Sequence, residues 1–327
     1  MPKYSIVVPF HNEQENLTLL YDRLTAVMEN VGSSFELVFV DDGSTDSTYR
    51  LLQEIAAVDS RVVVVRLRRN FGQTAALAAG FDHATGEFII AMDGDLQHDP
   101  NDIPNFIDKL EEGYDIVSGW RKKRIDNFVI RRIPSKIANK MMAKLSGVDI
   151  HDFGTTFKAY RADIIRDVPL YGELHRFIPA VASGYGASIV EIPIRNVNRE
   201  RGVSHYGISR TFRVMFDLLT IRFLLKYLSR PLHFFGRYGA LSIITGTLIA
   251  FYLMLLKVIY PAASIVDQHG PLLVLASVMI VSGVNLLAFG LLAEMQVRHY
   301  YEPSKRSPYV VGRVIKNTPQ NEEQVAE

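Results

Sequence analysis

Two aspartates that follow an apolar run are the residues whose type and spacing most clearly indicate chemistry. The run from Ile89 to Met92 is typical of a buried strand, and Asp93 and Asp95 come directly after it. In extended backbone, residues two apart point to the same side. A carboxylate pair of this kind can hold a hard divalent cation, Mg²⁺ or Mn²⁺, which in turn can hold a diphosphate. The spacing therefore predicts a cation-dependent phosphate site.

The elements that must position this pair alternate between strand and helix up to about residue 118. Apolar runs lie at residues 5–8, 36–40, 62–67, 88–92 and 116–117, separated by stretches of helical periodicity. Pro100 after Asp99 suits the first position of a helix. This alternation indicates an α/β fold, Rossmann-like, with a mostly parallel sheet covered on both faces. Ligands of such sheets bind beyond the carboxyl ends of the strands.

Polar clusters follow three of the expected strands, at residues 11–13, 41–44 and 93–95. Their carboxylates would repel one another at one sheet edge unless a cation or hydrogen-bond donors offset the charge. Any one cluster alone would also fit ordinary turn chemistry. Neither G-x-G-x-x-G nor G-x-x-x-x-G-K-[ST] occurs, which excludes a Rossmann dehydrogenase and a P-loop enzyme. An acidic edge favours a nucleotide diphosphate that serves as a leaving group.

The composition excludes other classes of protein. A net charge of +1 over 327 residues argues against a nucleic-acid binder. The absence of cysteine excludes disulfides, thiolate metal sites and a cysteine nucleophile.

Two apolar runs near the C-terminus have the length of membrane spans. Residues 236–260 hold only Arg237 and Lys257 as charges, and residues 271–293 hold none. Each run matches the roughly 20 apolar residues that cross a bilayer, although two buried helices of a large soluble core are the alternative. Basic residues flank the pair on both outer sides, so we expect a hairpin in the cytoplasmic (inner) membrane with both termini cytosolic. Basic and aromatic residues mix between 208 and 228, which indicates interfacial amphipathic helices or helices packed on the sheet domain.

Four motifs in the first half resemble a known family. IVVPFHNEQENL, VFVDDGSTDST, NFGQTAALAAGF and AMDGDLQHDP, in this order, are similar to inverting family 2 glycosyltransferases with the GT-A fold. HDFGTTFKAYR, the RERGVSHYG loop and the terminal hairpin narrow the resemblance to the dolichol-phosphate mannose synthase-like branch, and within it to bacterial polyprenyl-phosphate glycosyltransferases. The resemblance implies a cytosolic GT-A catalytic domain at 1–205, interfacial helices at 206–232, a transmembrane hairpin at 233–298 and a cytosolic C-terminal tail at 299–327.

The resemblance also implies which residues bind the donor and the metal. The base and ribose would contact Pro9, His11, Glu13, Val40 and Asp42. The metal, Mg²⁺ or Mn²⁺, would be held by Asp93, Asp95 and Gln97, with Gly94 in the donor-binding loop. The Asp42 carboxylate could accept from the ring N–H of uracil or guanine but would repel the corresponding nitrogen of cytosine. We therefore expect a UDP-sugar or a GDP-sugar, with UDP favoured.

Further polar residues would serve the diphosphate and the acceptor. Arg121 would lie near the donor diphosphate, unless it is one surface charge of the basic run 121–124. Arg131 and Ser135 would hold the acceptor phosphate, because the arginine fork meets phosphate oxygens two at a time. Attraction of anionic lipid headgroups is the other interpretation of this basic helix. Arg199 and Arg201 belong to a loop that closes over the donor in relatives.

Asp152 occupies the position of the family's proposed base and completes an implied catalytic set with Asp95 and Arg121. A lipid phosphate monoester has a second pKa near 6 and is largely dianionic at neutral pH. Such a nucleophile scarcely needs a base. Asp152 would therefore either orient the acceptor or take a proton from the monoanionic fraction.

Together these observations predict a membrane-bound, metal-dependent, inverting glycosyltransferase. It would move one sugar, with glucose from UDP-glucose as the first candidate, to undecaprenyl or dolichyl phosphate. A GDP-mannose:polyprenyl-phosphate mannosyltransferase and a non-catalytic, membrane-anchored nucleotide-sugar-binding scaffold are the alternatives. A processive polysaccharide synthase would carry Q-x-x-R-W and more spans. We also expect contact with membrane lipids and a homo-oligomer such as a tetramer, whose close helix packing the small residues Gly239, Ala240, Gly246, Gly283 and Gly290 would allow.

Overall fold

The computed structural model of the protein describes residues 1–122, 143, 147–168, 170, 174–195, 231–261, 264–301 and 308–316. The chain forms two compact units, one of residues 1–219 and 307–327 and the other of residues 220–306.

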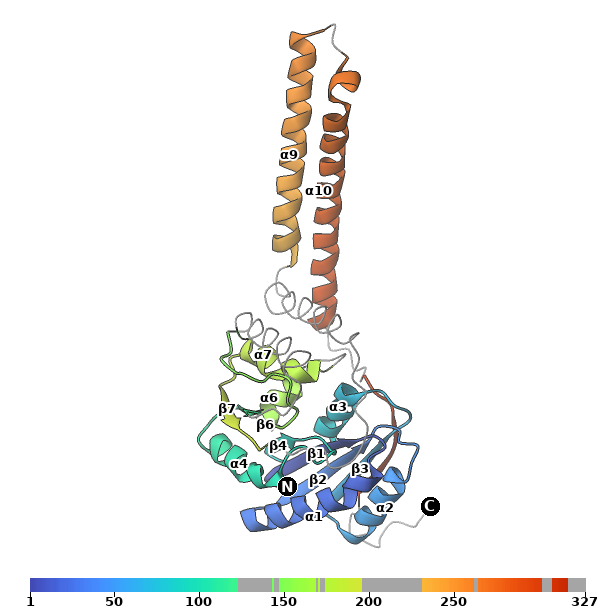
Figure 1. The fold of residues 1–327 in the computed structure, drawn as a ribbon, viewed down its shortest axis with the longest axis vertical. Coiled ribbons are helices and arrows are strands. Elements are labelled where there is room, and N and C mark those ends of the chain that lie inside the picture. Colours follow the sequence, from blue (N-terminus) through green and yellow to red (C-terminus); the bar gives the residue numbers. More distant parts are fainter. Residues whose placement is uncertain are drawn as a thin grey trace, which may run out of the picture. The chain divides into compact units, whose positions relative to one another are not determined.

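One sheet organises the first unit (Figure 1). Its strands in the described ranges are β1 (Tyr4–Phe10), β2 (Phe35–Asp41), β3 (Val62–Leu67), β4 (Phe88–Ala91), β5 (Ile116–Trp120), β6 (Lys158–Arg161), β7 (Ile189–Pro193) and β8 (Val311–Lys316), in the spatial order β7-β5-β6-β4-β1-β2-β3-β8. The pairs β1–β2, β1–β4, β2–β3 and β5–β7 are parallel. The expected strands β1 to β5 and the mostly parallel sheet are therefore confirmed.

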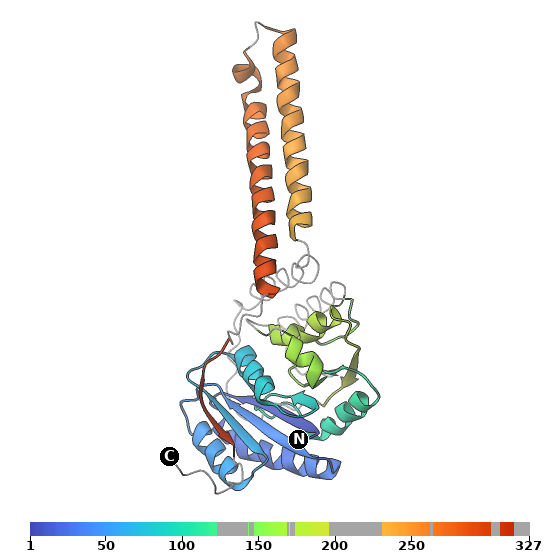
Figure 2. The same cartoon turned by 180° about the vertical axis from the view of Figure 1, so that it is seen from behind.

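Helices cover both faces of this sheet, as the alternating pattern predicts. The helices α1 (Gln14–Val31), α2 (Thr48–Val58) and α4 (Ile103–Glu111) pack on one face, and α3 (Gln73–His83), α6 (Ala162–Asp167) and α7 (Ile178–Ser183) on the other. Figure 2 shows the same arrangement from behind. The short 3-10 helices η1 (Pro100–Asp102) and η3 (Leu174–Phe177) complete the unit. As expected, Pro100 lies at the start of η1, and Asp99 caps this helix by accepting a hydrogen bond from the Asn101 backbone amide.

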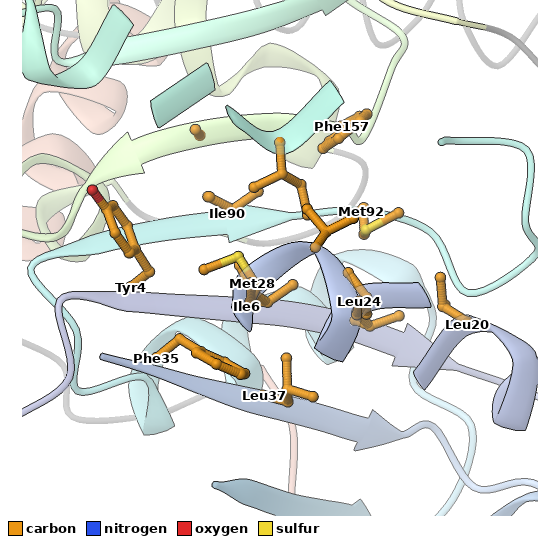
Figure 3. Packing of buried hydrophobic residues seen from close by; sticks show 14 of the residues in the cluster. Tyr4, Ile6, Leu20, Leu24, Met28, Phe35, Leu37, Ile90, Met92 and Phe157 are labelled. Carbon is orange, nitrogen blue, oxygen red and sulfur yellow. The ribbon is translucent and has the colours of Figure 1, made fainter. Parts of the chain in front are cut away.

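The period of two along each strand produces two separate cores. Ile6 and Val8 of β1 face the α1 side, whereas Val7 faces α3. Figure 3 shows how Leu20, Leu24 and Met28 of α1 pack on the first of these faces. Fully burying one such side chain contributes about 1.5–3 kcal/mol, so the two cores hold the strand ends rigidly in register.

A glycine brings α3 unusually close to the other face. A Cβ at Gly80 would lie only 2.2 Å from the Val7 side chain. A larger residue would push the helix away from β1 and would displace the N-terminus of α3, where Gln73 lies.

Two antiparallel strands are the main departure from the expected topology. β6 lies between β4 and β5 and runs antiparallel to both. β8 pairs antiparallel with β3, so part of the segment that we expected to be a C-terminal tail forms an edge strand of the sheet. Tyr309, just before β8, is buried and donates a hydrogen bond to Asp82 of α3 at 2.6 Å.

The second unit contains two long apolar helices, α9 (Pro231–Ile259) and α10 (Ile265–Tyr301). Segments 232–259 and 265–296 have mean hydropathies of 2.0 and 2.4, and only 17 % and 11 % of their most apolar windows are buried. They have the length and composition of membrane spans, and they lack the burial of helices in a soluble core. The backbone of α10 leaves helical geometry at His269, just before Pro271. A proline cannot donate the hydrogen bond of a continuous helix, which accounts for this kink.

The small residues of the second unit pack its two helices against each other. A Cβ at Gly239 would lie 2.8 Å from the Gly283 carbonyl oxygen, and a Cβ at Gly246 would lie 2.8 Å from that of Ala276. These glycines of α9 are therefore covered by α10 of the same chain.

Candidate active site

The topology brings the polar clusters to one edge of the sheet. β4, β1 and β2 are neighbours and run parallel, so the loops after Ala91, Phe10 and Asp41 leave the sheet side by side. We call this the carboxyl edge. Because β6 runs antiparallel to β4 and β5, it begins at this edge, and the segment that leads into β6 ends there.

Asp42 shapes the β2 side of this edge. Its two carboxylate oxygens accept hydrogen bonds from the backbone amides of Phe71 and Gly72 at 2.7 and 2.9 Å, and the residue is 4 % exposed. Its backbone carbonyl lies 2.8 Å from Nδ1 of His11. Asp42 thus ties the loop after β3 to the loop after β1. Recognition of uracil by its carboxylate stays a prediction.

The other expected nucleotide contacts lie at the same edge. Pro9 pairs in register with Val40, which is fully buried on the α3 side and supports the edge by packing. Glu13 accepts a hydrogen bond from Asn16 at 2.6 Å, and its backbone amide donates to the Thr48 hydroxyl. Direct contact of these residues with a donor stays a prediction.

The loop after β4 has a constrained backbone. A Cβ at Gly94 would lie 2.7 Å from the Phe10 ring, so only glycine fits against the end of β1. Leu96 is buried with a φ of 59°, and Asn12, in the neighbouring loop, has a φ of 56°. They are the non-glycine residues with positive φ in the described chain. Backbone strain of this kind is concentrated at functional sites.

The side chains of Gln73 and Thr156 both contact the Asp93 carboxylate. Nε2 of Gln73 donates to its Oδ1 at 2.6 Å and to the Thr156 hydroxyl at 3.1 Å. Burial raises the pKa of Asp93, and the hydrogen bond with Thr156 and the charges of Arg121 and Lys158 only partly offset this effect. The surrounding donors and cations therefore do not fully offset the cost of burying the charged form of Asp93.

The oxygen atoms of this loop fit a hard divalent cation whose remaining ligands would come from a diphosphate. Asp93 and Asp95 are both half-buried and supply carboxylate oxygens, and the backbone amide of Gln97 donates to Asp95 at 3.1 Å. Within the described ranges, no three His, Asp or Glu side chains gather as a metal cage. Mg²⁺ is usually held by one or two carboxylates, with water and substrate phosphates as the other ligands. Such a cation would stabilise the charged form of Asp93, which burial disfavours.

Arg121 and Asp152 form an ion pair at the end of β5. Nε of Arg121 donates to Oδ2 of Asp152 at 2.7 Å, and Nη2 donates to Oδ1 at 3.0 Å. The side chains are 17 % and 4 % exposed, so solvent screens this bidentate pair little. Arg121 is therefore not simply one of a run of surface charges.

Two further buried groups, Lys158 and His98, lie near this pair, and of these Lys158 was not predicted from the sequence. Lys158 of β6 is fully buried, and burial lowers its pKa to about 7 although the Asp152 charge acts in the opposite direction. His98 is also buried, which lowers its pKa to about 4, and its ring lies against Phe157 with centroids 5.3 Å apart. His98 accordingly forms part of the wall of the site. The sequence gives no clear signal for Lys158, because β6 is a four-residue strand that begins with this lysine and ends with Arg161.

Several expected site residues lie outside the described residues. These are Arg131 and Ser135 for the acceptor phosphate, Arg199 and Arg201 for the donor, and most of the interfacial segment 206–232.

Comparisons with known proteins agree with this fold and motif set. Residues 5–169 match the family Glycosyl transferase family 2. Dodecaprenyl-phosphate galacturonate synthase of Rhizobium johnstonii is 43 % identical over 95 % of this chain and 92 % of its own length. Undecaprenyl-phosphate 4-deoxy-4-formamido-L-arabinose transferase of Shewanella sediminis is 37 % identical over 95 % and 92 %. The chain belongs to glycosyl transferase family 2 and is a glycosyltransferase.

Solved structures confirm the GT-A fold. Glucosyl-3-phosphoglycerate synthase of Mycobacterium tuberculosis, solved with Mn²⁺ and UDP-glucose, superposes with a TM-score of 0.52 at 18 % identity. The match covers 68 % of this chain and 79 % of that one. At this identity, the likeness concerns the fold alone.

Proposed function

We propose that this protein transfers one sugar from a UDP-sugar to the phosphate of a polyprenyl phosphate at the cytoplasmic membrane. The observation that carries this proposal is a juxtaposition at the carboxyl edge. There the Asp93–Asp95 loop lies beside the Arg121–Asp152 pair, in a chain that also has two helices of membrane-spanning length. The names of the two curated relatives support a polyprenyl phosphate acceptor, and the solved neighbour with UDP-glucose supports UDP.

The reaction is a single displacement at the anomeric carbon. A bond forms from an oxygen of the lipid phosphate to that carbon, and the bond to the nucleotide diphosphate breaks, so the diphosphate leaves with the electron pair. Attack from the face opposite the leaving group inverts the configuration. Asp93 and Asp95, with Gln97, would hold Mg²⁺ or Mn²⁺, which when bound offsets charge on the leaving diphosphate.

In this proposal Asp152 orients Arg121 rather than accepting a proton. A phosphate monoester with a second pKa near 6 is already largely dianionic at neutral pH. Both oxygens of Asp152 accept hydrogen bonds from Arg121, and protonation would disrupt that arrangement. The oriented guanidinium can then meet phosphate oxygens, with Arg131 and Ser135 as further acceptor contacts and Arg199 and Arg201 closing over the donor.

The sugar is a separate question. The relatives' names point to galacturonate and 4-deoxy-4-formamido-L-arabinose, so both rank before the glucose that sequence reasoning placed first. UDP-galacturonate is the first donor to test because the relative named for galacturonate is the more similar of the two.

A transfer assay with the purified full chain tests the proposal. Labelled UDP-galacturonate, UDP-4-deoxy-4-formamido-L-arabinose, UDP-glucose and GDP-mannose are each incubated with undecaprenyl phosphate and Mn²⁺ or Mg²⁺, and lipid-linked product is extracted. We expect product from at least one UDP-sugar and none in EDTA. Asp93→Asn and Asp95→Asn should each lower the rate by at least about a hundredfold, whereas the exposed Asp108→Asn should not. Binding of UDP without any lipid product would favour the scaffold alternative instead.

A further inference from the structure

Asp152 lies in a short segment, residues 151–155, that contains no regular secondary structure, and we call this segment the Asp152 loop. The position of this loop sets the position of the Asp152 carboxylate, to which Arg121 is hydrogen-bonded. Inside the loop, Oδ1 of Asp152 accepts a hydrogen bond from the Gly154 amide at 3.1 Å. Two ionisable side chains from β6 and β7, the strands on either side of β5, supply further contacts.

Glu191 of β7 binds the amide groups at the start of the loop. Its Oε1 accepts from the backbone amides of His151 and Asp152 at 2.9 and 2.8 Å. Its Oε2 accepts from the His151 amide at 3.0 Å and lies 2.8 Å from Nδ1 of the same residue. The Glu191 side chain is only 7 % exposed. The His151 ring, in turn, stacks on Trp120, with centroids 4.4 Å apart.

Lys158 of β6 binds the carbonyl groups at the other end of the loop. Its Nζ donates to the Phe153 carbonyl oxygen at 3.2 Å and also to that of Thr155. In the sheet, Lys158 is in register with Ala91 of β4 and Ser118 of β5, the strands that lead to Asp93 and Arg121. The lysine thus ties the loop to the two strands that carry the rest of the site.

Neither charge is needed to form the sheet. Burying a charged group is costly, and an apolar side chain of similar size would usually pack at least as well in such a place. Here a carboxylate accepts hydrogen bonds from loop amides, and the Lys158 amino group, charged or neutral, donates to loop carbonyls, so one five-residue loop is held by an acceptor and a donor. Such an arrangement fixes the loop in a single position.

We propose that Glu191 and Lys158 are positioning residues that hold the Asp152 loop in place and affect turnover only through the Arg121–Asp152 pair. This inference rests on the proposed function for its kinetic consequence. Its structural content, a loop fixed by two buried charges, stands apart from the identity of the substrates.

A double-mutant cycle tests the kinetic part. Glu191→Ala and Lys158→Met should each lower kcat with undecaprenyl phosphate by about 10–100-fold, the range for partners that orient a functional side chain. In an Asp152→Ala background the same substitutions should lower kcat by less than about threefold, because the residue that Glu191 and Lys158 position is gone. Glu191→Gln keeps one accepting oxygen and should be intermediate. Losses that multiply fully in the Asp152→Ala background would overturn the proposal.

Hydrogen exchange tests the structural part without any substrate. In Glu191→Ala and Lys158→Met, amides of residues 151–155 should exchange at least about tenfold faster than in the wild type, while amides of β1 and β2 stay protected. Glu36→Ala is the matched control. Glu36 is another buried carboxylate that accepts a backbone amide, from Thr85, at the opposite edge of the sheet. It should leave the Asp152 loop unchanged.

The two readouts separate the possible failures. If the wild type makes no lipid-linked sugar, the proposed function is wrong, and hydrogen exchange still decides whether the two charges hold the loop. Unchanged exchange at residues 151–155 in both variants would overturn the inference even if the wild type is active.

Discussion

Asp93 and Asp95 show what residue type and spacing can predict. Their position after an apolar strand identified the loop, and the structure places that loop at the carboxyl edge with a constrained backbone. The supporting contact from Gln73, 20 residues earlier, was not predictable. It depends on how closely α3 approaches β1, and no local pattern encodes that distance.

The constraint at Gly94 leads to a prediction at the residue scale. Gly94→Ala would place a methyl group 2.7 Å from the Phe10 ring and force the Asp93–Asp95 loop to move. Overpacking of this kind costs about 1–3 kcal/mol. If the Asp93–Asp95 loop shifts to relieve the clash, the affinity for UDP with Mn²⁺, measured by titration calorimetry, should fall roughly ten- to a hundredfold.

A second substitution separates this effect from unfolding. Phe10→Leu makes room at the clash, so the double variant should regain part of the lost affinity, while Phe10→Leu alone binds UDP nearly normally. Unchanged affinity in Gly94→Ala would contradict a role for this packing.

The Arg121–Asp152 pair shows the limit of sequence reasoning. Both residues were expected in the site, but their contact was not, because they are 31 residues apart and β6 is inserted antiparallel between β4 and β5. A parallel strand at this place would have put the end of the Asp152 loop at the opposite edge of the sheet. Strand direction depends on which strands β6 pairs with, and its four residues, Lys158 to Arg161, do not reveal it.

Among the elements, the connection after α2 offers a prediction about pH. Asp59 accepts hydrogen bonds from Arg61, which also contacts Glu29 of α1 at 3.0 Å. Burial alone would raise the pKa of Asp59, but the hydrogen bonds outweigh it and lower the pKa below 3.8. The stabilising contribution is therefore present above about pH 4 and is lost as the pH falls through the lowered pKa.

We accordingly expect Asp59→Asn to lower the free energy of unfolding by about 1–2 kcal/mol at pH 7, a value discounted because Arg61 is 35 % exposed. The difference from wild type should shrink steadily below pH 4. Urea unfolding followed by fluorescence of the single tryptophan measures both. Asp163→Asn, which breaks an exposed pair with Arg161, should change stability by less than about 0.5 kcal/mol.

The edge strand β8 gives the second prediction at the scale of elements. It supplies ladder partners to β3, with Val65 opposite Val314, and Tyr309 anchors it to α3. Deleting residues 307–327 would leave the β3 edge unpaired, and an unpaired edge promotes aggregation. We expect faster hydrogen exchange in β3 and a Tm lower by roughly 5 °C.

A shorter deletion, of residues 318–327, keeps β8 and serves as the control. It should leave β3 exchange and Tm unchanged. Equal protection of β3 in both deletions would show that β8 does not stabilise the sheet. The sequence did not predict β8. A six-residue segment after a long apolar region looks like a tail, and only the unpaired edge of β3 makes it a strand.

For the molecule as a whole, the glycines of α9 and α10 explain how the hairpin packs. Small residues were expected to allow close helix packing, and Gly239, Gly246 and Gly283 do so between the two helices of one chain. A homo-oligomer stays a prediction.

The return of the chain to the sheet constrains the membrane topology. β3 precedes the two apolar helices and β8 follows them, yet the two strands pair in one folded unit. The segments on either side of the hairpin must therefore lie on the same side of the membrane, which requires an even number of crossings. That this side is the cytoplasm stays a prediction, which the basic flanks support through the positive-inside rule.

The lack of native cysteine makes this topology directly testable. Val58→Cys lies on an exposed part of the catalytic unit, and Ser264→Cys lies in the turn between α9 and α10. In intact cells, a membrane-impermeant maleimide should label the cysteine at 264 but not the one at 58, and after permeabilisation it should label both. Protection of both until permeabilisation would show that the hairpin does not cross. Labelling at 58 in intact cells would place the catalytic unit outside, away from cytosolic nucleotide sugars, and would contradict the proposed function.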